Sequence, residues 1–351
     1  MAITYHAGRR IQATQADFDG TPAISGGWKE VGRTTSSGST ITVSSLPDKR
    51  YYMILYDATA QASGGSDNNW RFNGDAGNNY AHRKQVNGTS DSTGTNQSKI
   101  YNMESGGSRH EFGVNYLANK SDKEKFMIGN NVINWTSGVS GDASRKELVS
   151  KWTNTSDVID EIQLYYSAGS STSADVVVLG YDPADTHTTN FWEPLADVTT
   201  GSTGALSSGT FTAKKYLWVQ AYTPSSSNSS PDGYVEFNAD SGSNYVHRRS
   251  HNGGSDTTGT SDGIGIRIDG SGGQTAKFHN MFIVNNSANE KLVICRSVTQ
   301  QTAGAGNIPT RTESVGKWVN TSDQITRVDI VDQYASHQWG AGSFIKVWGS
   351  N

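Results

Sequence analysis

Apolar side chains along this chain alternate with polar ones or gather in short runs, and clusters of Gly, Asn and Asp separate these segments. Alternation is typical of strands with one buried face, and short runs rich in β-branched and aromatic residues are typical of buried strands. A sustained apolar period of 3.6 residues, which would indicate helices, does not occur. The clearest predicted strands are 51–56, 175–179, 216–222, 277–284 and 325–331. The pattern therefore predicts an all-β protein.

One stretch of the chain returns almost unchanged further along. FNGDAGNNYAHR at 72–83 becomes FNADSGSNYVHR at 237–248, and KWTNTSD at 151–157 becomes KWVNTSD at 317–323. The spacing between matching positions stays nearly constant over most of the chain. Such self-similarity is typical of a duplicated domain. We therefore expect two copies of one domain.

The repeat divides the chain into an N-terminal arm, 1–26, a first repeat, 27–185, and a second repeat, 186–351. The stretch 180–189 is polar and contains a proline, which is typical of a domain boundary. Each repeat holds about eight or nine predicted strands, which indicates an antiparallel β-sandwich of the jelly-roll type. The arm has no counterpart in the second repeat, and we expect it to be extended and to add a strand to a neighbouring subunit or another protein.

Composition and charge exclude several classes of protein. Apolar residues make up 34% of the chain and charged residues 18%, while 39 Gly residues supply turns. The net charge of −4 offers no general attraction to nucleic acid. No apolar stretch approaches the roughly 20 residues of a membrane helix. We therefore expect neither a nucleic-acid partner nor a membrane partner.

Two further features indicate where the protein is made and what it lacks. The N-terminus has no long apolar segment typical of a signal peptide, so we expect synthesis in the host cytoplasm. Cys295 is the single cysteine, which excludes an intramolecular disulfide and a cysteine-cluster metal site. Cys295 lies in an apolar run and is interpreted as a small buried residue. We expect no cofactor.

The most similar segment of the two repeats is rich in Asn, Asp and Gly, and it has three interpretations. These residues favour tight turns, and we prefer this interpretation. They also offer oxygen ligands for calcium, and the candidates are Asp75, Asn78, Asn79, Asp240 and Asn244. Finally, they could bind sugar hydroxyls while the adjacent aromatic rings stack on the sugar, and those rings are Tyr80 and Tyr245.

Two other pairs of matching residues are candidates for a site. Trp152 and Trp318 are either sugar-stacking rings or core residues that anchor a strand, and we favour the core. His82 and His247 have no further ligand at metal-binding spacing, so we expect them to form hydrogen bonds within the sheet or at a subunit contact.

Glu147 and Glu313 each follow an arginine by two residues and indicate a strand face of alternating charge. A glycosidase would need two carboxylates about 5–10 Å apart. The sequence does not give that distance, so a glycan depolymerase stays as our last-ranked hypothesis. The sequence GTSDG at 259–263 fits a nucleophile-elbow motif, but it lies in a loop before a strand and its counterpart lacks the motif. We interpret it as chance.

Several segments resemble virion structural proteins of marine tailed phages, of the head-decoration, head-fibre or tail-fibre type. The segments that carry the resemblance are 5–12, 72–80, 179–192 and 317–327. The resemblance spans most of the chain and implies a virion component without catalytic residues. It does not indicate which component.

These observations together predict a non-enzymatic phage structural protein on the particle surface, such as a capsid decoration or cement protein or a fibre. The alternatives are a double jelly-roll major capsid protein and a lectin-like module that binds a receptor. Because the surface is rich in Ser, Thr, Asn and aromatics, which suit large wet interfaces, we expect a homotrimer. The expected partners are other virion proteins, through the arm, and a host surface glycan.

Overall fold

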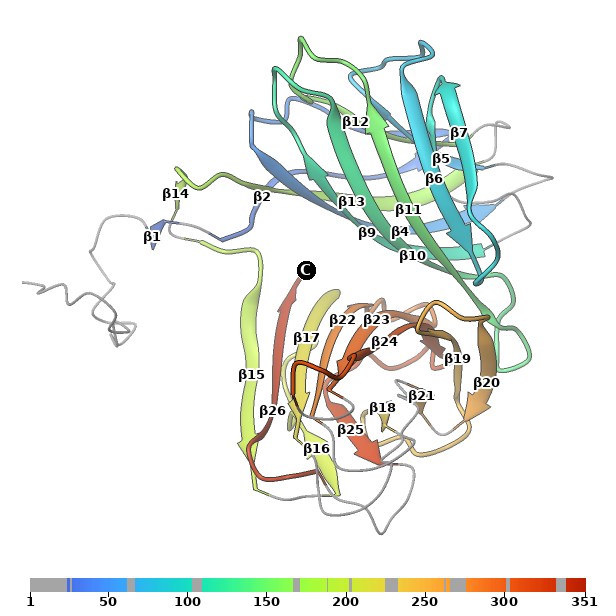
Figure 1. Ribbon diagram of the computed structural model, residues 1–351, viewed down its shortest axis with the longest axis vertical. Helices are drawn as coiled ribbons and strands as arrows, with labels where there is room; N and C mark the ends of the chain where they lie inside the picture. Colours follow the sequence, from blue (N-terminus) through green and yellow to red (C-terminus); the bar gives the residue numbers. More distant parts are fainter. Residues whose placement is uncertain are drawn as a thin grey trace, which may run out of the picture.

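The computed structural model describes residues 24–25, 27–61, 67–102, 109–166, 171–187, 189–201, 204–224, 233–261, 263–265, 276–300, 304–332 and 339–351. All the regular secondary structure assigned in these ranges is β-strand (Figure 1). No helix that could cross a membrane is found among the described residues. The predicted arm, 1–26, lies outside the described residues except for β1 (Ile24–Ser25). Its proposed extended form and docking role stay predictions.

The first repeat forms two antiparallel sheets that enclose one core. In spatial order, the larger sheet contains β2 (Lys29–Gly38), β13 (Ser171–Tyr181), β4 (Tyr51–Gln61), β9 (Arg109–Ala118), β10 (Lys125–Asn134), β11 (Ala143–Trp152), β6 (Tyr80–Val86) and β7 (Ser92–Gln97). The smaller sheet contains β3 (Thr40–Val43), β12 (Ile162–Tyr166), β5 (Asn68–Phe72) and β8 (Ile100–Tyr101).

The second repeat forms the same pair of sheets. In spatial order, its larger sheet contains β15 (Glu193–Thr200), β26 (Ser343–Ser350), β17 (Tyr216–Thr223), β22 (Lys277–Val284), β23 (Lys291–Thr299), β24 (Thr310–Trp318), β19 (Tyr245–His251) and β20 (Thr257–Ser261). Its smaller sheet contains β16 (Ala205–Ser207), β25 (Val328–Asp332), β18 (Gly233–Phe237) and β21 (Ile264–Gly265).

The two repeats share one strand order, so the predicted fold of two tandem antiparallel β-sandwiches is confirmed. β26 lies between β15 and β17, just as β13 lies between β2 and β4 in the first repeat. The described part of each repeat has one sheet of eight strands and one of four, which is more than the eight or nine expected. Very short strands such as β8 and β21 account for part of the difference, because two residues carry no readable alternation.

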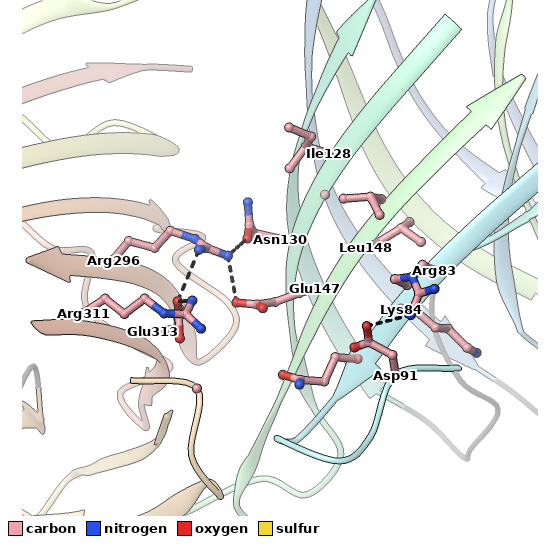
Figure 2. A pocket seen from close by; sticks show the side chains of 14 residues that line it. Arg83, Lys84, Asp91, Ile128, Asn130, Glu147, Leu148, Arg296, Arg311 and Glu313 are labelled. Atoms are coloured by element: carbon pink, nitrogen blue, oxygen red, sulfur yellow. Dashed lines mark hydrogen bonds and ion pairs between the residues drawn. The ribbon is translucent and has the colours of Figure 1, made fainter. Parts of the chain in front are cut away.

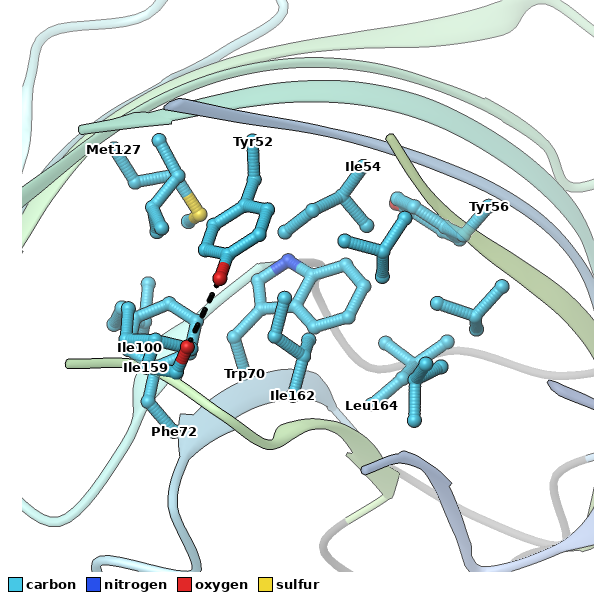
Figure 3. Close-up of a cluster of buried hydrophobic side chains, with 14 of the residues drawn as sticks. Tyr52, Ile54, Tyr56, Trp70, Phe72, Ile100, Met127, Ile159, Ile162 and Leu164 are labelled. Atoms are coloured by element: carbon cyan, nitrogen blue, oxygen red, sulfur yellow. Dashed lines mark hydrogen bonds between the residues drawn. The ribbon is translucent and has the colours of Figure 1, made fainter. Parts of the chain in front are cut away.

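Each sandwich buries its own apolar core between its two sheets. In the first repeat, Trp70 and Leu164 of the smaller sheet meet Tyr52 and Ile54 of the larger sheet (Figure 3). The Tyr52 hydroxyl donates a hydrogen bond of 3.1 Å to the carbonyl of Ile159, which satisfies a polar atom that is costly to bury alone. The core therefore accepts a tyrosine ring without an unpaired hydroxyl.

The connection between the repeats pairs with the chain that enters the first repeat. β14 (Thr186–His187) forms a short antiparallel ladder with β1, in which Ile24 lies opposite His187. Directly after β14, the Phe191 amide donates to the Trp28 carbonyl at 2.8 Å. The polar stretch that the sequence predicts as the boundary thus runs alongside the start of the first repeat before the second repeat begins.

Candidate functional site

The repeated Asn-Asp-Gly segment is a turn built around one carboxylate. Asp75 accepts hydrogen bonds from the Gly77 amide at 2.8 Å, from the Asn79 side chain and from the Trp152 indole at 2.7 Å. Burial alone would raise the pKa of Asp75, but these hydrogen bonds hold it below its usual value. The carboxylate is therefore ionised and engaged on three sides.

The second repeat reproduces this turn. Asp240 accepts hydrogen bonds from the Gly242 amide at 2.9 Å, from Asn244 and from the Trp318 indole at 2.8 Å. The pKa of Asp240 is lowered in the same way, because these hydrogen bonds outweigh the effect of burial. The preferred interpretation of the segment as turn structure is confirmed in both repeats.

The four aromatic candidates for sugar stacking are core residues. Tyr80, Trp152, Tyr245 and Trp318 are each at most 1% exposed, and in each repeat the Tyr and Trp rings stack on one another. The Tyr80 hydroxyl bonds the backbone of the same turn at Phe72 and Asp75. A buried ring has no free face for a sugar, so the stacking interpretation is wrong in this structure. Sequence could not exclude it, because a Trp before a polar turn occurs in both settings.

The calcium candidates share their oxygens with neighbouring groups. Asp75 and Asp240 bind amide and indole hydrogens, and Asn79 and Asn244 are the donors to them. Asn78 is exposed on the same turn. Within the described residues, no group of three His, Cys, Asp or Glu side chains could hold a metal ion. The turn as folded directs hydrogen-bond donors, and not a set of converging oxygens, at the carboxylate.

The matching histidines are buried beside glycines of the neighbouring strand. Burial lowers the pKa of His82 and of His247 to about 4, which keeps both rings neutral at neutral pH. Gly94 and Gly259 lie against these rings, where a Cβ would come within about 3 Å. Nδ1 of each ring is buried and has no hydrogen-bond partner among the described residues. The expected hydrogen bond within the sheet is therefore not made by Nδ1.

A third apolar cluster lies between the repeats, where the larger sheet of each one is turned toward the other (Figure 1). From the first repeat it contains Met53, Leu55, Phe112, Val114, Val132, Ala143, Val177 and Leu179. From the second repeat it contains Phe191, Trp192, Tyr216, Phe282, Val284, Leu292, Ile294 and Val315. These positions point away from the two sandwich cores, so the larger sheets have apolar residues on both faces at the contact.

Buried ion pairs join the repeats around this cluster. Arg145 of β11 contacts Asp256 of the second repeat at 2.7 Å, and both side chains are almost completely buried. Lys215 of the second repeat contacts Asp175 at 2.8 Å and Asp57 at 3.2 Å. Burial would raise the pKa of Asp175, but the ammonium group of Lys215 and further hydrogen bonds lower it. Both sides of the contact therefore depend on charges from the other repeat.

The end of the β10–β11 hairpin, residues 134–143, reaches across to the second repeat. Lys317 donates to the Asn134 side chain at 2.9 Å, and the Gly138 amide donates to Glu290 at 2.5 Å. Thr260 donates to the Val139 carbonyl at 3.2 Å. Arg248 also donates to the Ala143 carbonyl at 2.8 Å. The hairpin is thus fixed by hydrogen bonds from three strands of the second repeat, β19, β20 and β24, and by the loop before β23.

A cleft of about 430 Å³ opens at the edge of this contact, and Figure 2 shows charged side chains from both repeats converging in it. Arg296 of β23 lies at its centre, with one nitrogen 2.7 Å from Glu147 and another 3.7 Å from Glu313. Glu147 and Glu313 are equivalent residues of the two repeats, and Arg296 also bonds Asn130, its own equivalent. Ile128 and Val149, both about half exposed, add apolar surface to the wall from the first repeat.

The cleft therefore brings together the two carboxylates that sequence suggested as a pair. Glu147 also contacts Arg145 at 3.0 Å, and Glu313 forms an ion pair with Arg311. Each carboxylate is thus held by more than one guanidinium group, and Arg296 of the second repeat contacts both of them. The arrangement suits an ionic clamp between the repeats better than general acid catalysis.

Comparisons with known proteins identify no family. No family model matches this chain, and no curated protein matches its sequence. Among solved structures, domains LG4-5 of the mouse laminin alpha1 chain are 11% identical, with a TM-score of 0.18 over 98% of this chain and 93% of that chain. A TM-score this low carries no argument about fold or function.

The interface between the repeats was missed by sequence reasoning, although a signal for it exists. The run Leu292-Val-Ile-Cys295 is apolar at every position, so both faces of β23 must be covered. Val293 and Cys295 face the sandwich core, whereas Leu292 and Ile294 face the other repeat. Burial raises the pKa of Cys295 to about 11, as expected for a buried thiol. If both faces of this strand had been considered, the apolar run would have predicted that another surface packs on its outer face.

Proposed function

We propose that this chain is a non-enzymatic structural protein on the surface of a phage particle, of the decoration, cement or fibre type. The observation that carries the proposal is that the residues shared by both repeats stabilise the fold of each sandwich. The Asp75–Trp152 and Asp240–Trp318 hydrogen bonds join each turn to the buried Trp of its own sandwich. Residues kept for architecture in both copies are what a structural subunit requires.

The contact between the repeats supports the same proposal. It combines an apolar cluster with buried ion pairs such as Arg145–Asp256, so the two sandwiches pack on one another. An apolar contact between domains restrains their relative motion, which suits a component that covers or projects from a particle. We further propose the homotrimer expected from the surface composition, and docking on other virion proteins through the arm.

The test is the composition of intact particles. Particles of the phage that encodes this chain are purified by density gradient, and their proteins are identified and counted by mass spectrometry. The proposal expects the chain at a fixed copy number per particle, and gold-labelled antibodies should bind intact particles. Absence from purified particles would overturn it. Release of reducing sugars from host glycans by the purified chain would instead establish the depolymerase that we ranked last.

A further inference from the structure

An amide, an amine and a carboxylate meet in the buried contact between the repeats. They belong to Asn134 at the end of β10, Lys317 of β24 and Glu290 before β23, and we call them the Asn–Lys–Glu cluster. Nζ of Lys317 donates to Oδ1 of Asn134 at 2.9 Å, and Nδ2 of Asn134 donates to Oε2 of Glu290 at 2.5 Å. Nζ of Lys317 also lies 3.3 Å from the same Oε2 atom. Each of the three groups therefore contacts the other two.

The two charged partners fix the orientation of the Asn134 amide. An ammonium group only donates hydrogen bonds and a carboxylate only accepts them, so the amide oxygen must face Lys317 and the amide nitrogen must face Glu290. In this orientation Cγ of Asn134 is one bond away from the oxygen that Lys317 contacts. The amine thus lies within contact range of an electrophilic carbon, and the carboxylate lies beside the nitrogen that would leave.

The cluster is shut off from water. The side chain of Lys317 is completely buried, and Asn134 and Glu290 are each 6% exposed. Leu292, which lies opposite Lys317 on the neighbouring strand, is part of the apolar cluster between the repeats. Burial lowers the pKa of Lys317, although nearby carboxylates oppose the shift. A buried lysine gives up its proton more readily than an exposed one, and the neutral amine is a nucleophile.

Two backbone groups of the β10–β11 hairpin hold the amine and the carboxylate in place. The Gly138 amide donates to Oε1 of Glu290 at 2.5 Å, which leaves Oε2 to contact Lys317 and Asn134. The Thr136 carbonyl accepts a further hydrogen bond from Nζ of Lys317. The three side chains are therefore ordered around one another before any reaction, which removes much of the entropic barrier to bond formation.

We propose that Lys317 and Asn134 join in an isopeptide bond that links the two repeats covalently, and that Glu290 transfers the proton. Nζ of Lys317 gives one proton to Oε2 of Glu290, and its electron pair forms a bond to Cγ of Asn134. The bond between Cγ and Nδ2 then breaks, and Glu290 returns the proton to Nδ2 as that nitrogen leaves.

The atoms and charges of this step balance without any other reactant. Nζ of Lys317 carries three hydrogens before the reaction and one after it. The two hydrogens that it loses leave with Nδ2 of Asn134 as an ammonium ion, which carries the positive charge that Lys317 had. Glu290 ends as the carboxylate that it was at the start, so it acts as general base and then as general acid.

The first repeat provides an internal reference for this chemistry. Lys151 and Glu124, the equivalents of Lys317 and Glu290, form an ion pair of 2.9 Å, but their side chains are 40% and 34% exposed. Gln300 stands at the position equivalent to Asn134 and is exposed. Water stabilises the charge of an exposed ammonium group, so we expect Lys151 to stay unmodified.

The bond would keep the two repeats from separating. Asn134 and Lys317 are 183 residues apart in the chain, and a cross-link over so long a loop restricts the unfolded chain strongly and stabilises the folded one. The inference goes beyond the proposed structural function and does not rest on it, because the reaction needs only the folded chain.

The first experiment measures the mass of the intact chain after folding and purification. The unchanged chain should be lighter than its sequence requires by the mass of one ammonia molecule, whereas Lys317→Arg and Glu290→Gln should keep their full masses. Lys317→Arg keeps the positive charge and Glu290→Gln keeps the shape of the side chain, so each removes one reacting group with little change in packing. Lys151→Arg, at the equivalent exposed position, is the matched control and should still lose ammonia.

The second experiment cuts the chain at its methionines with cyanogen bromide. The cut after Met281 separates the fragment 128–281, which contains Asn134, from the fragment 282–351, which contains Lys317. In the unchanged chain the bond should hold these two fragments together on a denaturing gel, and in Lys317→Arg they should run apart. A tryptic digest of the unchanged chain should also contain a branched peptide that joins Asn134 to Lys317, which tandem mass spectrometry identifies.

Two results would overturn the inference. One is an unchanged chain that keeps its full calculated mass after prolonged incubation in the folded state. The other is a loss of ammonia without the branched peptide, because succinimide formation at Asn87-Gly88 or Asn252-Gly253 removes the same mass and leaves no cross-link. Circular dichroism of each variant checks that a missing bond is not a loss of fold. The mass and the digest of the unchanged chain decide the question even if a variant does not fold.

Discussion

The turns around the buried aspartates and the Trp rings that bond them match in the two repeats, whereas the outer faces of the repeats do not. Trp152 and Trp318 are buried alike, and each donates to the carboxylate of its own turn at 2.7 or 2.8 Å. Val149 and Val315 also occupy equivalent strand positions, yet Val149 is exposed and Val315 is buried between the repeats. Similar sequences thus give the same fold, while the surroundings of each sandwich decide whether its outer face is buried or exposed.

The largest effect is expected inside the cores, where the two repeats should respond equally. Trp152→Ala and Trp318→Ala each remove a fully buried ring and leave a cavity, so each should cost about 3–5 kcal/mol of the free energy of unfolding. Chemical denaturation followed by circular dichroism measures this loss. Asp240→Asn is the smaller matched change, because it keeps the shape and removes only the charge. If only one of the two Trp variants lost unfolding free energy, the two cores would not be equivalent.

The second effect tests the difference between the faces with one pair of equivalent aspartates. Asp256→Asn removes the more deeply buried of the two carboxylates that contact the buried guanidinium of Arg145, which should cost about 3 kcal/mol. Asp91→Asn changes the equivalent aspartate of the first repeat, which pairs instead with Arg83 of its own repeat, and because both side chains are about half exposed the loss should stay below about 1 kcal/mol. Denaturation midpoints at low and high salt measure both, and only the Asp91 pair should weaken strongly with salt.

The third effect concerns the apolar positions of the same faces. Val315→Ala removes two methyl groups from the cluster between the repeats and should cost about 1–3 kcal/mol. Val149→Ala changes the equivalent residue of the first repeat, which is 47% exposed, and it should change stability by less than about 0.5 kcal/mol. Chemical denaturation measures both losses, and equal losses would show that this position is covered in both repeats.

The smallest effect is a pH dependence shared by the interiors. The pKa of His82 and of His247 is about 4 in the folded chain, below the usual value near 6.5. Between these values the unfolded chain binds protons that the folded chain excludes, so stability is full above about pH 6.5 and falls as the pH drops toward 4. Each histidine should contribute on the order of 1 kcal/mol to this loss.

Glutamine variants measure this contribution. His82→Gln and His247→Gln should each flatten the slope of unfolding free energy against pH by a similar amount. The pKa of Asp57 and of Asp175 is held below the usual range by neighbouring charges and hydrogen bonds, so their contribution is lost only at still lower pH. The histidine window therefore stays separate, and an unchanged slope in both variants would contradict the prediction.

The sequence by itself determined the class of fold, the duplication and the turn around each aspartate. Strand alternation depends only on which side chains are apolar, and Asp75 and Asp240 bond groups a few residues away or on a strand next in the sheet. Such local rules are legible in one chain. The burial of Cys295 and of both Trp residues followed from the same reasoning.

Only the tertiary structure decided which outer faces are covered and which charges meet. Glu147 and Glu313 are far apart in the chain, and nothing in their local sequence predicts that Arg296 joins them. Likewise, Phe126 and Leu292 are equivalent apolar residues, and one is exposed while the other is buried. The physical reason is that burial of an outward strand position depends on what packs on the sheet from outside, and that depends on how the two sandwiches are joined.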